Sequence, residues 1–381
     1  MEREIEKVIE LVDSLIKSKE LRKAEEICLT KLATLSHSAE FLFKLAQLYS
    51  LQNKILLAIE TYLQGLAIAP SNLKALIELG ILYRQNNKLT DAIETFLRVI
   101  EIDSKNLPAL NELGITYREN NQQSKAIETF LRVIEIDSKN LPALNELGIT
   151  YRQNNQQSKA IETFLKALEI NPNSGYILSN LATAYRDMGS FEKAKSVLQT
   201  ALQVNPNNLA AISNLASVYR DLGNIKLAAE LLTEALQLDP NNISILSNLS
   251  AVYKDLGDLD NAENLLLKSI ELLLQTNNKH QIARAYSGLA AILINKGEYL
   301  KATELLERSL IIYEEMGINE SGKFNSLANL ATLFFNIGDF DSAIKYIKIA
   351  EEGAMKFLGV DHPNTKNITR LYKNIKLNTQ F

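Results

Sequence analysis

Residues 107–140 read LPALNELGITYRENNQQSKAIETFLRVIEIDSKN, and residues 141–174 read LPALNELGITYRQNNQQSKAIETFLKALEINPNS. The two stretches differ at only eight of their 34 positions, which indicates an internal duplication. Three prolines carry the same spacing further along the chain, since Pro172, Pro206 and Pro240 lie 34 residues apart. A period of 34 residues is typical of a solenoid built from helix–turn–helix units. We therefore predict a repeat array rather than a set of globular domains.

The same frame divides nearly the whole chain into ten repeats. Seven 34-residue repeats fill residues 5–242, with boundaries at 5–38, 39–72, 73–106, 107–140, 141–174, 175–208 and 209–242. Three longer repeats of 40–41 residues follow at 243–282, 283–323 and 324–364. The pattern of residues 365–381 predicts a final helix that caps the open apolar end of the stack. We expect one continuous solenoid, because each repeat packs mainly on its neighbours.

The repeat 175–208 shows the chemistry of one unit. Apolar residues recur there at the i, i+3, i+4 and i+7 spacing of two helices: Leu178, Leu181, Ala182 and Tyr185, then Phe191, Ala194, Leu198 and Ala201. Gly189 separates the two stripes, and Pro206 ends the second. Earlier repeats carry asparagine at the turn, a residue that also tolerates the left-handed conformation: Asn53, Asn87, Asn121 and Asn155. The first repeat has lost this glycine.

This pattern resembles the tetratricopeptide-repeat family, whose repeats place Leu-Gly, Tyr, Ala, Phe, Ala and Pro at fixed offsets. The resemblance implies an all-α, right-handed superhelical solenoid of about ten antiparallel helix pairs with a C-terminal capping helix. It also implies a protein that binds other proteins. Residues 243–364, including the segment from Phe357 to Asn364, are similar to the longer repeats of kinesin-light-chain-like proteins. That second resemblance implies binding of cargo or of a peptide.

The charge balance and the absence of apolar runs narrow the class of partner. Lys and Arg number 41 against 45 Asp and Glu, so a nucleic-acid partner is not expected. No apolar run approaches the roughly 20 residues that span a bilayer. The charged start, Met1 to Lys7, lacks the apolar segment of a signal peptide. We expect a cytoplasmic protein that does not bind membranes.

The sequence offers little for catalysis. Its histidines, His37, His280 and His362, fall in three different connections between repeats, whereas a metal site needs ligands that converge. Cys28, the only cysteine, stands in a core position that holds phenylalanine in later repeats. Gly80, Gly114 and Gly148 lie inside predicted helices, where they allow close packing. We therefore expect no enzyme activity, no cofactor and no metal.

Two ladders of polar residues are predicted on the inner face, which the first helix of each pair lines. At the sixth position of the repeat the later units carry amides, with a gap at Gly288: Asn180, Asn214, Asn248 and Asn329. A carboxamide both donates and accepts, which suits a peptide backbone. The asparagines resemble those lining the repeat superhelix of O-linked N-acetylglucosamine transferase, which grip extended substrate chains. The alternative is that they bond neighbouring helices or water.

The second ladder, at the twelfth position, is basic: Arg84, Arg118, Arg152, Arg186, Arg220 and Lys254. It is either a stripe that binds a partner or a rim of ion pairs between repeats. Asp187, Asp221 and Asp255 follow its members directly and weaken its field. We expect a scaffold that binds an extended or helical segment of a partner protein in its concave groove. The alternatives are a receptor regulated by a peptide and a self-assembling structural element. A monomer is favoured, but the sequence leaves the oligomeric state open.

Overall fold

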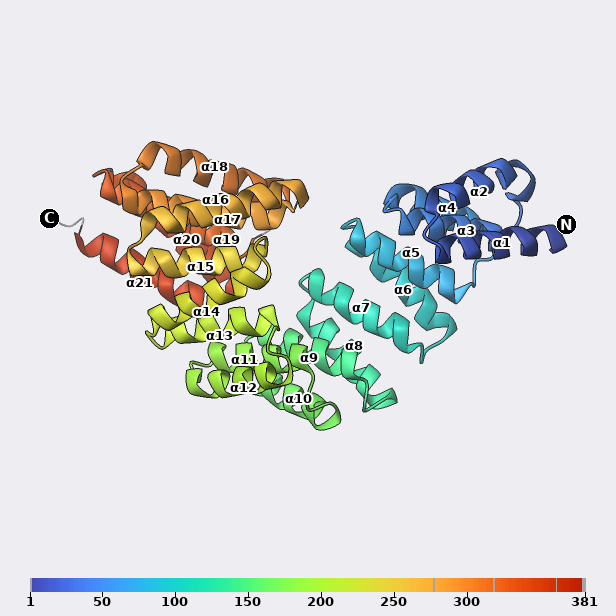
Figure 1. The fold of residues 1–381 in the computed structure, drawn as a ribbon, viewed down its shortest axis with the longest axis horizontal. Helices are drawn as coiled ribbons and strands as arrows, with labels where there is room; N and C mark the ends of the chain where they lie inside the picture. The colour runs from blue at the N-terminus through green and yellow to red at the C-terminus, as the bar shows by residue number, and fades with distance from the viewer. Residues whose placement is uncertain (1, 277, 318, 361, 379–381) are drawn as a thin grey trace. The chain divides into compact units, whose positions relative to one another are not determined.

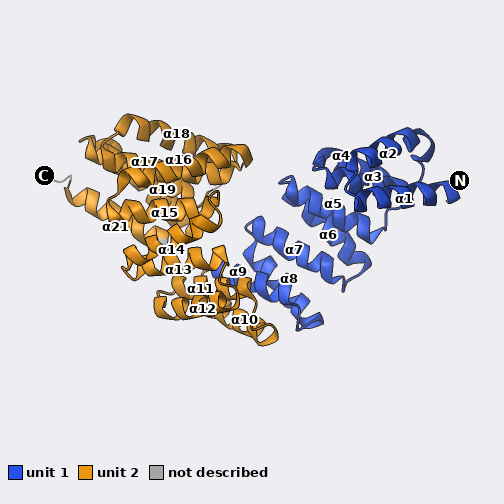
Figure 2. Ribbon diagram, in the orientation of Figure 1, with its two compact units in different colours: residues 1–154 blue, residues 155–381 orange. Residues whose placement is uncertain are grey.

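The computed structural model describes residues 2–276, 278–317, 319–360 and 362–378 (Figure 1). In these residues 21 helices follow one another and no strand occurs. Within each unit described below, neighbouring helices of the chain pack on one another and α21 (Pro363–Asn378) comes last, so the expected all-α solenoid is confirmed. The chain separates into two compact units, residues 1–154 and 155–381 (Figure 2).

Unit 1 holds the first nine helices: α1 (Glu2–Lys17), α2 (Leu21–Leu35), α3 (Ala39–Leu51), α4 (Ile55–Ile68), α5 (Leu73–Gln85), α6 (Leu89–Ile102), α7 (Leu107–Glu119), α8 (Gln123–Ile136) and α9 (Leu141–Gln153). The starts of α3, α5, α7 and α9 coincide with the repeat boundaries predicted from the sequence. Side chains at the last position of the repeat explain this agreement, because Asn72, Asn106 and Asn140 cap the helix that follows. Each accepts a hydrogen bond from the backbone N–H three residues further on.

Unit 2 holds the remaining helices: α10 (Gln157–Ile170), α11 (Gly175–Asp187), α12 (Phe191–Val204), α13 (Leu209–Asp221), α14 (Ile225–Leu238), α15 (Ile243–Leu256), α16 (Leu259–Thr276), α17 (Lys279–Lys296), α18 (Tyr299–Glu315), α19 (Ser321–Asn336), α20 (Phe340–Leu358) and α21 (Pro363–Asn378). The added residues of the longer repeats lengthen their helices, since α16 and α17 each have 18 residues whereas α13 has 13. As a result α17 begins at Lys279 instead of at residue 283. Helix α21 is the expected cap, and residues 379–381 of that prediction lie outside the described residues.

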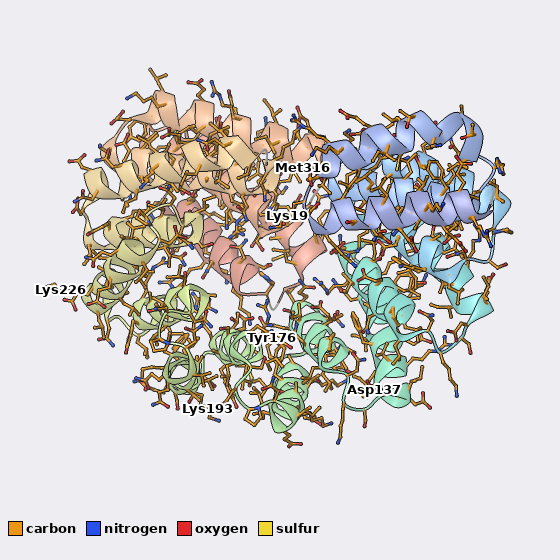
Figure 3. All side chains as sticks on the ribbon, turned by 45° about the vertical axis from the view of Figure 1, so that its right-hand side comes forward. Lys19, Asp137, Tyr176, Lys193, Lys226 and Met316 are labelled. Atoms are coloured by element: carbon orange, nitrogen blue, oxygen red, sulfur yellow. The ribbon has the colours of Figure 1, made fainter. Side chains whose placement is uncertain are left out.

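The turn inside each pair adopts the expected left-handed conformation. The φ angles of Asn53, Asn87, Asn121 and Asn155 lie between 55° and 59°, and that of Gly189 is 73°. The first repeat makes the same turn with neither asparagine nor glycine. The residue there is Lys19, between α1 and α2, and its φ angle is 61° (Figure 3). The hydrogen bond that closes this turn, from Glu20 N–H to the Leu15 carbonyl, measures 2.9 Å. The packing of the turn therefore holds a lysine in a region that favours glycine.

The core lies between the helices of each pair, where small residues allow close approach. The alanine slot of the second helix is fully buried in all ten repeats, among them those of Ala92, Ala126, Ala160, Ala194, Ala228 and Ala262. The glycine of the first helix has a related role. A Cβ atom on Gly80 would lie 2.6 Å from the ring of Phe96, and one on Gly114 equally close to Phe130. These glycines serve packing, as the sequence predicts.

The strained turn of the first repeat gives a testable prediction. Replacing Lys19 by glycine removes the left-handed strain at the cost of a more flexible unfolded chain, and should stabilise the α1–α2 pair by about 0.5–1 kcal/mol. Hydrogen exchange of the α1 and α2 amides should slow. Lys17→Gly, in the last turn of α1, should speed the same exchange. Unchanged or faster exchange in Lys19→Gly would show that the left-handed conformation of Lys19 is not strained.

The alanine slot gives a second prediction. Ala194 is fully buried where α12 packs on α11. Ala194→Leu should overpack this site and lower the free energy of unfolding of unit 2 by about 1–3 kcal/mol, measured by thermal melting. Gln199→Leu adds a leucine to an exposed position of the same helix and serves as the control. Equal melting of the two variants would mean that the slot is not tight.

Candidate binding site

The inner face of each unit is formed by the first helix of every pair. Contacts run directly between consecutive first helices, from α1 to α3 and from α5 to α9 in unit 1, and from α11 through α19 in unit 2. Residues at one repeat position therefore stand side by side along this face. Both predicted ladders lie on these helices.

In unit 1 the arginine ladder is built into the fold. Arg84 donates from Nη2 to Glu112 at 2.8 Å and from Nη1 to Glu119 at 3.2 Å. Arg118 donates in the same way to Glu146 at 2.9 Å. In both cases the acid occupies the sixth position of the next repeat, 28 residues along the chain. These side chains are only about one-fifth to one-third exposed, so the pairs are better shielded from water than surface ion pairs.

In unit 2 the arginines pair with a different position. Arg186 binds Asp221, and Arg220 binds Asp255, each 35 residues along the chain. Asparagine replaces glutamate at the sixth position here, so the acid comes from the thirteenth position alone, the position that Glu119 holds for Arg84 in unit 1. Arg152 also has an interaction partner. These ion pairs join neighbouring repeats, and the predicted role of the arginines in binding a partner stays a prediction.

The asparagine ladder is divided between structural and unused amides. Asn248 donates to the Ser213 hydroxyl, and Asn329 donates to the carbonyl and the hydroxyl of Ser287, both at 3.2 Å. Asn180 also has a partner. Asn214 is half-buried, and its carboxamide makes no hydrogen bond to any residue that the structure describes. Asn214 and the amide oxygens of Asn248 and Asn329 therefore keep unused hydrogen-bonding capacity.

A cavity of about 590 Å³ opens on the inner face of unit 2, between α13, α15, α16 and α17. It gathers three of the predicted site residues, Asn214, Asn248 and Lys254. Helix α17 adds Gln281 and Arg284, and no acidic side chain belongs to the described lining. We call this cavity the basic pocket. The other seven predicted site residues lie outside its lining: Arg84, Arg118, Arg152, Arg186, Arg220, Asn180 and Asn329.

The change in repeat type explains why the basic pocket lies here. Lys254 is the last member of the basic ladder, and the next repeat offers Gly288 and Asn295 at the positions where earlier repeats place an acid. Lys254 therefore forms no ion pair with the described residues. Gly288 also contributes no side chain to fill the groove. The pocket is open because Gly288 has no side chain to fill it and no acid of the next repeat pairs with Lys254.

Arg284 supplies the second positive charge of the basic pocket. It is exposed and forms no ion pair within the described ranges. Its field does reach Glu320: burial acts to raise the pKa of that carboxyl, but the hydrogen bond from His280 and the charges of His280 and Arg284 outweigh burial and lower it. His280 Nε2 lies 2.5 Å from Glu320 Oε1, so the carboxylate already has a direct partner. Arg284 is left to face the pocket.

Sequence reasoning did not select Arg284 or Gln281 for the site. Arg284 occupies the second position of the repeat 283–323, a position that the repeat pattern directs to the inner face or its rim. That signal was present in the sequence. Gln281 precedes the predicted boundary, and only the early start of α17 brings it to the pocket.

The residues considered for chemistry take structural places. Cys28 is fully buried, and burial raises the pKa of its thiol to about 11, as expected for a core residue. His280 lies in the first turn of α17 and not in a connection. No group of three or more metal-ligating side chains occurs in the described part of the chain. Nor does any described helix have the length and apolar character needed to cross a membrane.

Comparison with known proteins agrees with this architecture. Four sequence profiles, each described as a tetratricopeptide repeat, match residues 43–107, 95–128 and 142–174, and, for the fourth profile, 174–241 and 242–315. No curated protein sequence matches the chain significantly.

Several solved structures are similar in fold. Yeast Tom70 gives a TM-score of 0.54 at 12% identity, covering 100% of this chain and 97% of that one. The APC/C hetero-tetramer Cut9–Hcn1 gives 0.53 at 16% identity, covering 97% of this chain and 83% of that one. A tetratricopeptide repeat protein from Parabacteroides merdae gives 0.55 at 17% identity, covering 61% of this chain and 93% of that one. Because the identities are low, these likenesses show the fold alone. Together with the sequence profiles, they place the chain in the tetratricopeptide-repeat family, whose members are scaffolds for protein–protein interaction.

Proposed function

We propose that the protein is a scaffold that holds an extended, acidic segment of a partner protein in the inner groove of unit 2. The observation that carries the proposal is the charge of the basic pocket. Lys254 and Arg284 line it together, and neither forms an ion pair with the described residues. A carboxylate from a partner would supply the acid that the next repeat lacks, through charge-assisted hydrogen bonds.

The amides around these charges suit a peptide main chain. Asn214 and Asn248 lie on consecutive first helices, α13 and α15, and both line the basic pocket. A carboxamide can donate to a backbone carbonyl and accept from a backbone N–H, so it binds an extended chain without reading its side chains. In this arrangement the asparagines hold the main chain, while Lys254 and Arg284 select an acidic side chain or a terminal carboxylate.

Selection from a peptide library tests this proposal. A phage library of random 12-residue peptides, panned on the full chain, should enrich peptides rich in Asp and Glu. The synthetic form of one enriched peptide is then titrated by fluorescence polarisation. Lys254→Glu combined with Arg284→Glu should weaken binding at least tenfold, and wild-type affinity should fall as salt screens the charges. Lys226→Glu, a charge reversal at an exposed site at the edge of the unit, is the matched control (Figure 3).

The role of the amides is tested separately. Asn214→Ala combined with Asn248→Ala should weaken the same peptide about tenfold, because each hydrogen bond contributes about 0.5–1.5 kcal/mol. Asn248 also bonds Ser213, so circular dichroism and melting must first show an intact fold. Enrichment without acidic residues, or unchanged affinity in the folded charge-reversal variant, would place the binding surface elsewhere.

A further inference from the structure

A second cavity, of about 320 Å³, lies in unit 1 on the side of α1, α3, α4 and α5. Its lining combines two aromatic rings, Phe43 and Tyr62, with three carboxylates and two lysines. We call it the aromatic cavity. It is distinct from the basic pocket, and neither predicted ladder of site residues contributes to it.

Glu78 gives the aromatic cavity an uncompensated negative charge. It occupies the sixth position of the repeat 73–106, and its counterparts Glu112 and Glu146 are each held by an arginine 28 residues earlier. The residue 28 positions before Glu78 is Ser50, which cannot supply that charge. Glu78 accordingly forms no ion pair with any described residue. The carboxylate of Glu78 is therefore left without the cationic partner that its two counterparts have.

The two rings form a rigid apolar wall next to this carboxylate. Phe43 and Tyr62 stack with their centroids 6.1 Å apart and an angle of 27° between their planes. Gly65 lets the Phe43 ring lie against α4, since a Cβ atom there would come within 2.5 Å of the ring. Repeats further along the chain carry Ile77, Asn111 and Asn145 at the position of Phe43, so this wall belongs to the second repeat.

Tyr62 is a polar group left without a partner. Tyr62 lines the aromatic cavity and is only 3% exposed, yet its hydroxyl forms no hydrogen bond with the residues that the structure describes. Burial and the negative charge of Glu78 both raise the pKa of this phenol, which agrees with a hydroxyl close to the Glu78 carboxylate. The hydroxyl is not among the fully buried polar atoms without a partner in the described residues, so water in the cavity reaches it, and a ligand there can bond to it.

The lysines of the lining do not satisfy this site. Lys44 is already bound to Asp13 at 2.7 Å and to Gln47 at 3.0 Å. Lys74 is exposed in the first turn of α5 and forms no ion pair in the described ranges. With Lys44 and Asp13 cancelling, Glu40 and Glu78 outweigh Lys74, and the cavity keeps a net negative charge.

We propose that the aromatic cavity binds the side chain of an arginine in a partner segment. A guanidinium is planar and stacks on aromatic faces, so it suits the wall of Phe43 and Tyr62. Its N–H groups can donate at the same time to a carboxylate and to a phenol oxygen. The arginine of the partner pairs with Glu78 in the way that arginines of the chain itself pair with Glu112 and Glu146. It does not depend on the proposed function of the basic pocket.

Nuclear magnetic resonance on the full chain with labelled phenylalanine and tyrosine rings tests the proposal. The probe is Nα-acetyl-arginine N-methylamide, and its comparison is the citrulline analogue, which has the same shape without the charge. The arginine compound should shift the Phe43 and Tyr62 ring signals in a saturable way at millimolar concentration. The citrulline analogue should cause less than a tenth of that shift.

Three variants decide where the probe binds. Glu78→Gln should weaken binding at least threefold, and Ser50→Arg should abolish it, because the new arginine stands before Glu78 as Arg84 stands before Glu112. Glu60→Gln, at an exposed site on α4, should leave binding unchanged. Ser50→Arg keeps the cavity lining intact, so loss of binding there cannot come from a collapsed pocket. Equal shifts from arginine and citrulline, or full affinity in both Glu78→Gln and Ser50→Arg, would overturn the proposal.

Discussion

The pairing of a basic side chain with an acid of the following repeat governs the inner face of this protein. Arg84 and Arg118 reach the sixth position of the next repeat, and Arg84, Arg186 and Arg220 reach the thirteenth. Each pair contributes modestly to stability. Their larger effect is on charge, because a repeat inside the array neutralises its neighbour and leaves little for a partner to bind. A charged side chain of the inner face is left for a partner protein to bind where the neighbouring repeat has no side chain of opposite charge.

Both cavities lie at such places. Glu78 has Ser50 before it where later glutamates have arginine, and Lys254 has Gly288 and Asn295 after it where earlier repeats have an acid. One site is therefore acidic with an aromatic wall, and the other is basic with amides around it. A solenoid can be nearly neutral overall, with a formal charge of −4, and still present two sites of opposite preference.

Most of the fold could be predicted from the sequence, because the 34-residue period fixes the residue types that pairing demands. The asparagine turns and the alanine slot follow from local chemistry, and the structure confirms them.

The binding site could be predicted from the sequence only in part. Asn214, Asn248 and Lys254 could be placed on the inner face by position alone. Whether an arginine is free or paired depends on distances between repeats, which a single sequence does not give. Arg284 and Gln281 depend on how the added residues extend α16 and α17. Lys19 was unexpected because the packing of the first repeat overrides its preference.

The central claim is that a charge left unpaired by the neighbouring repeat is where a partner binds. A crystal structure of the chain with an acidic peptide selected on it tests this most directly. We expect a peptide carboxylate within about 3 Å of Lys254 Nζ or the Arg284 guanidinium. The ion pairs of Arg186 and Arg220 should remain in place. A peptide bound on the outer helices, or one that binds by displacing Asp221 or Asp255 from its arginine while Lys254 and Arg284 face solvent, would contradict the account.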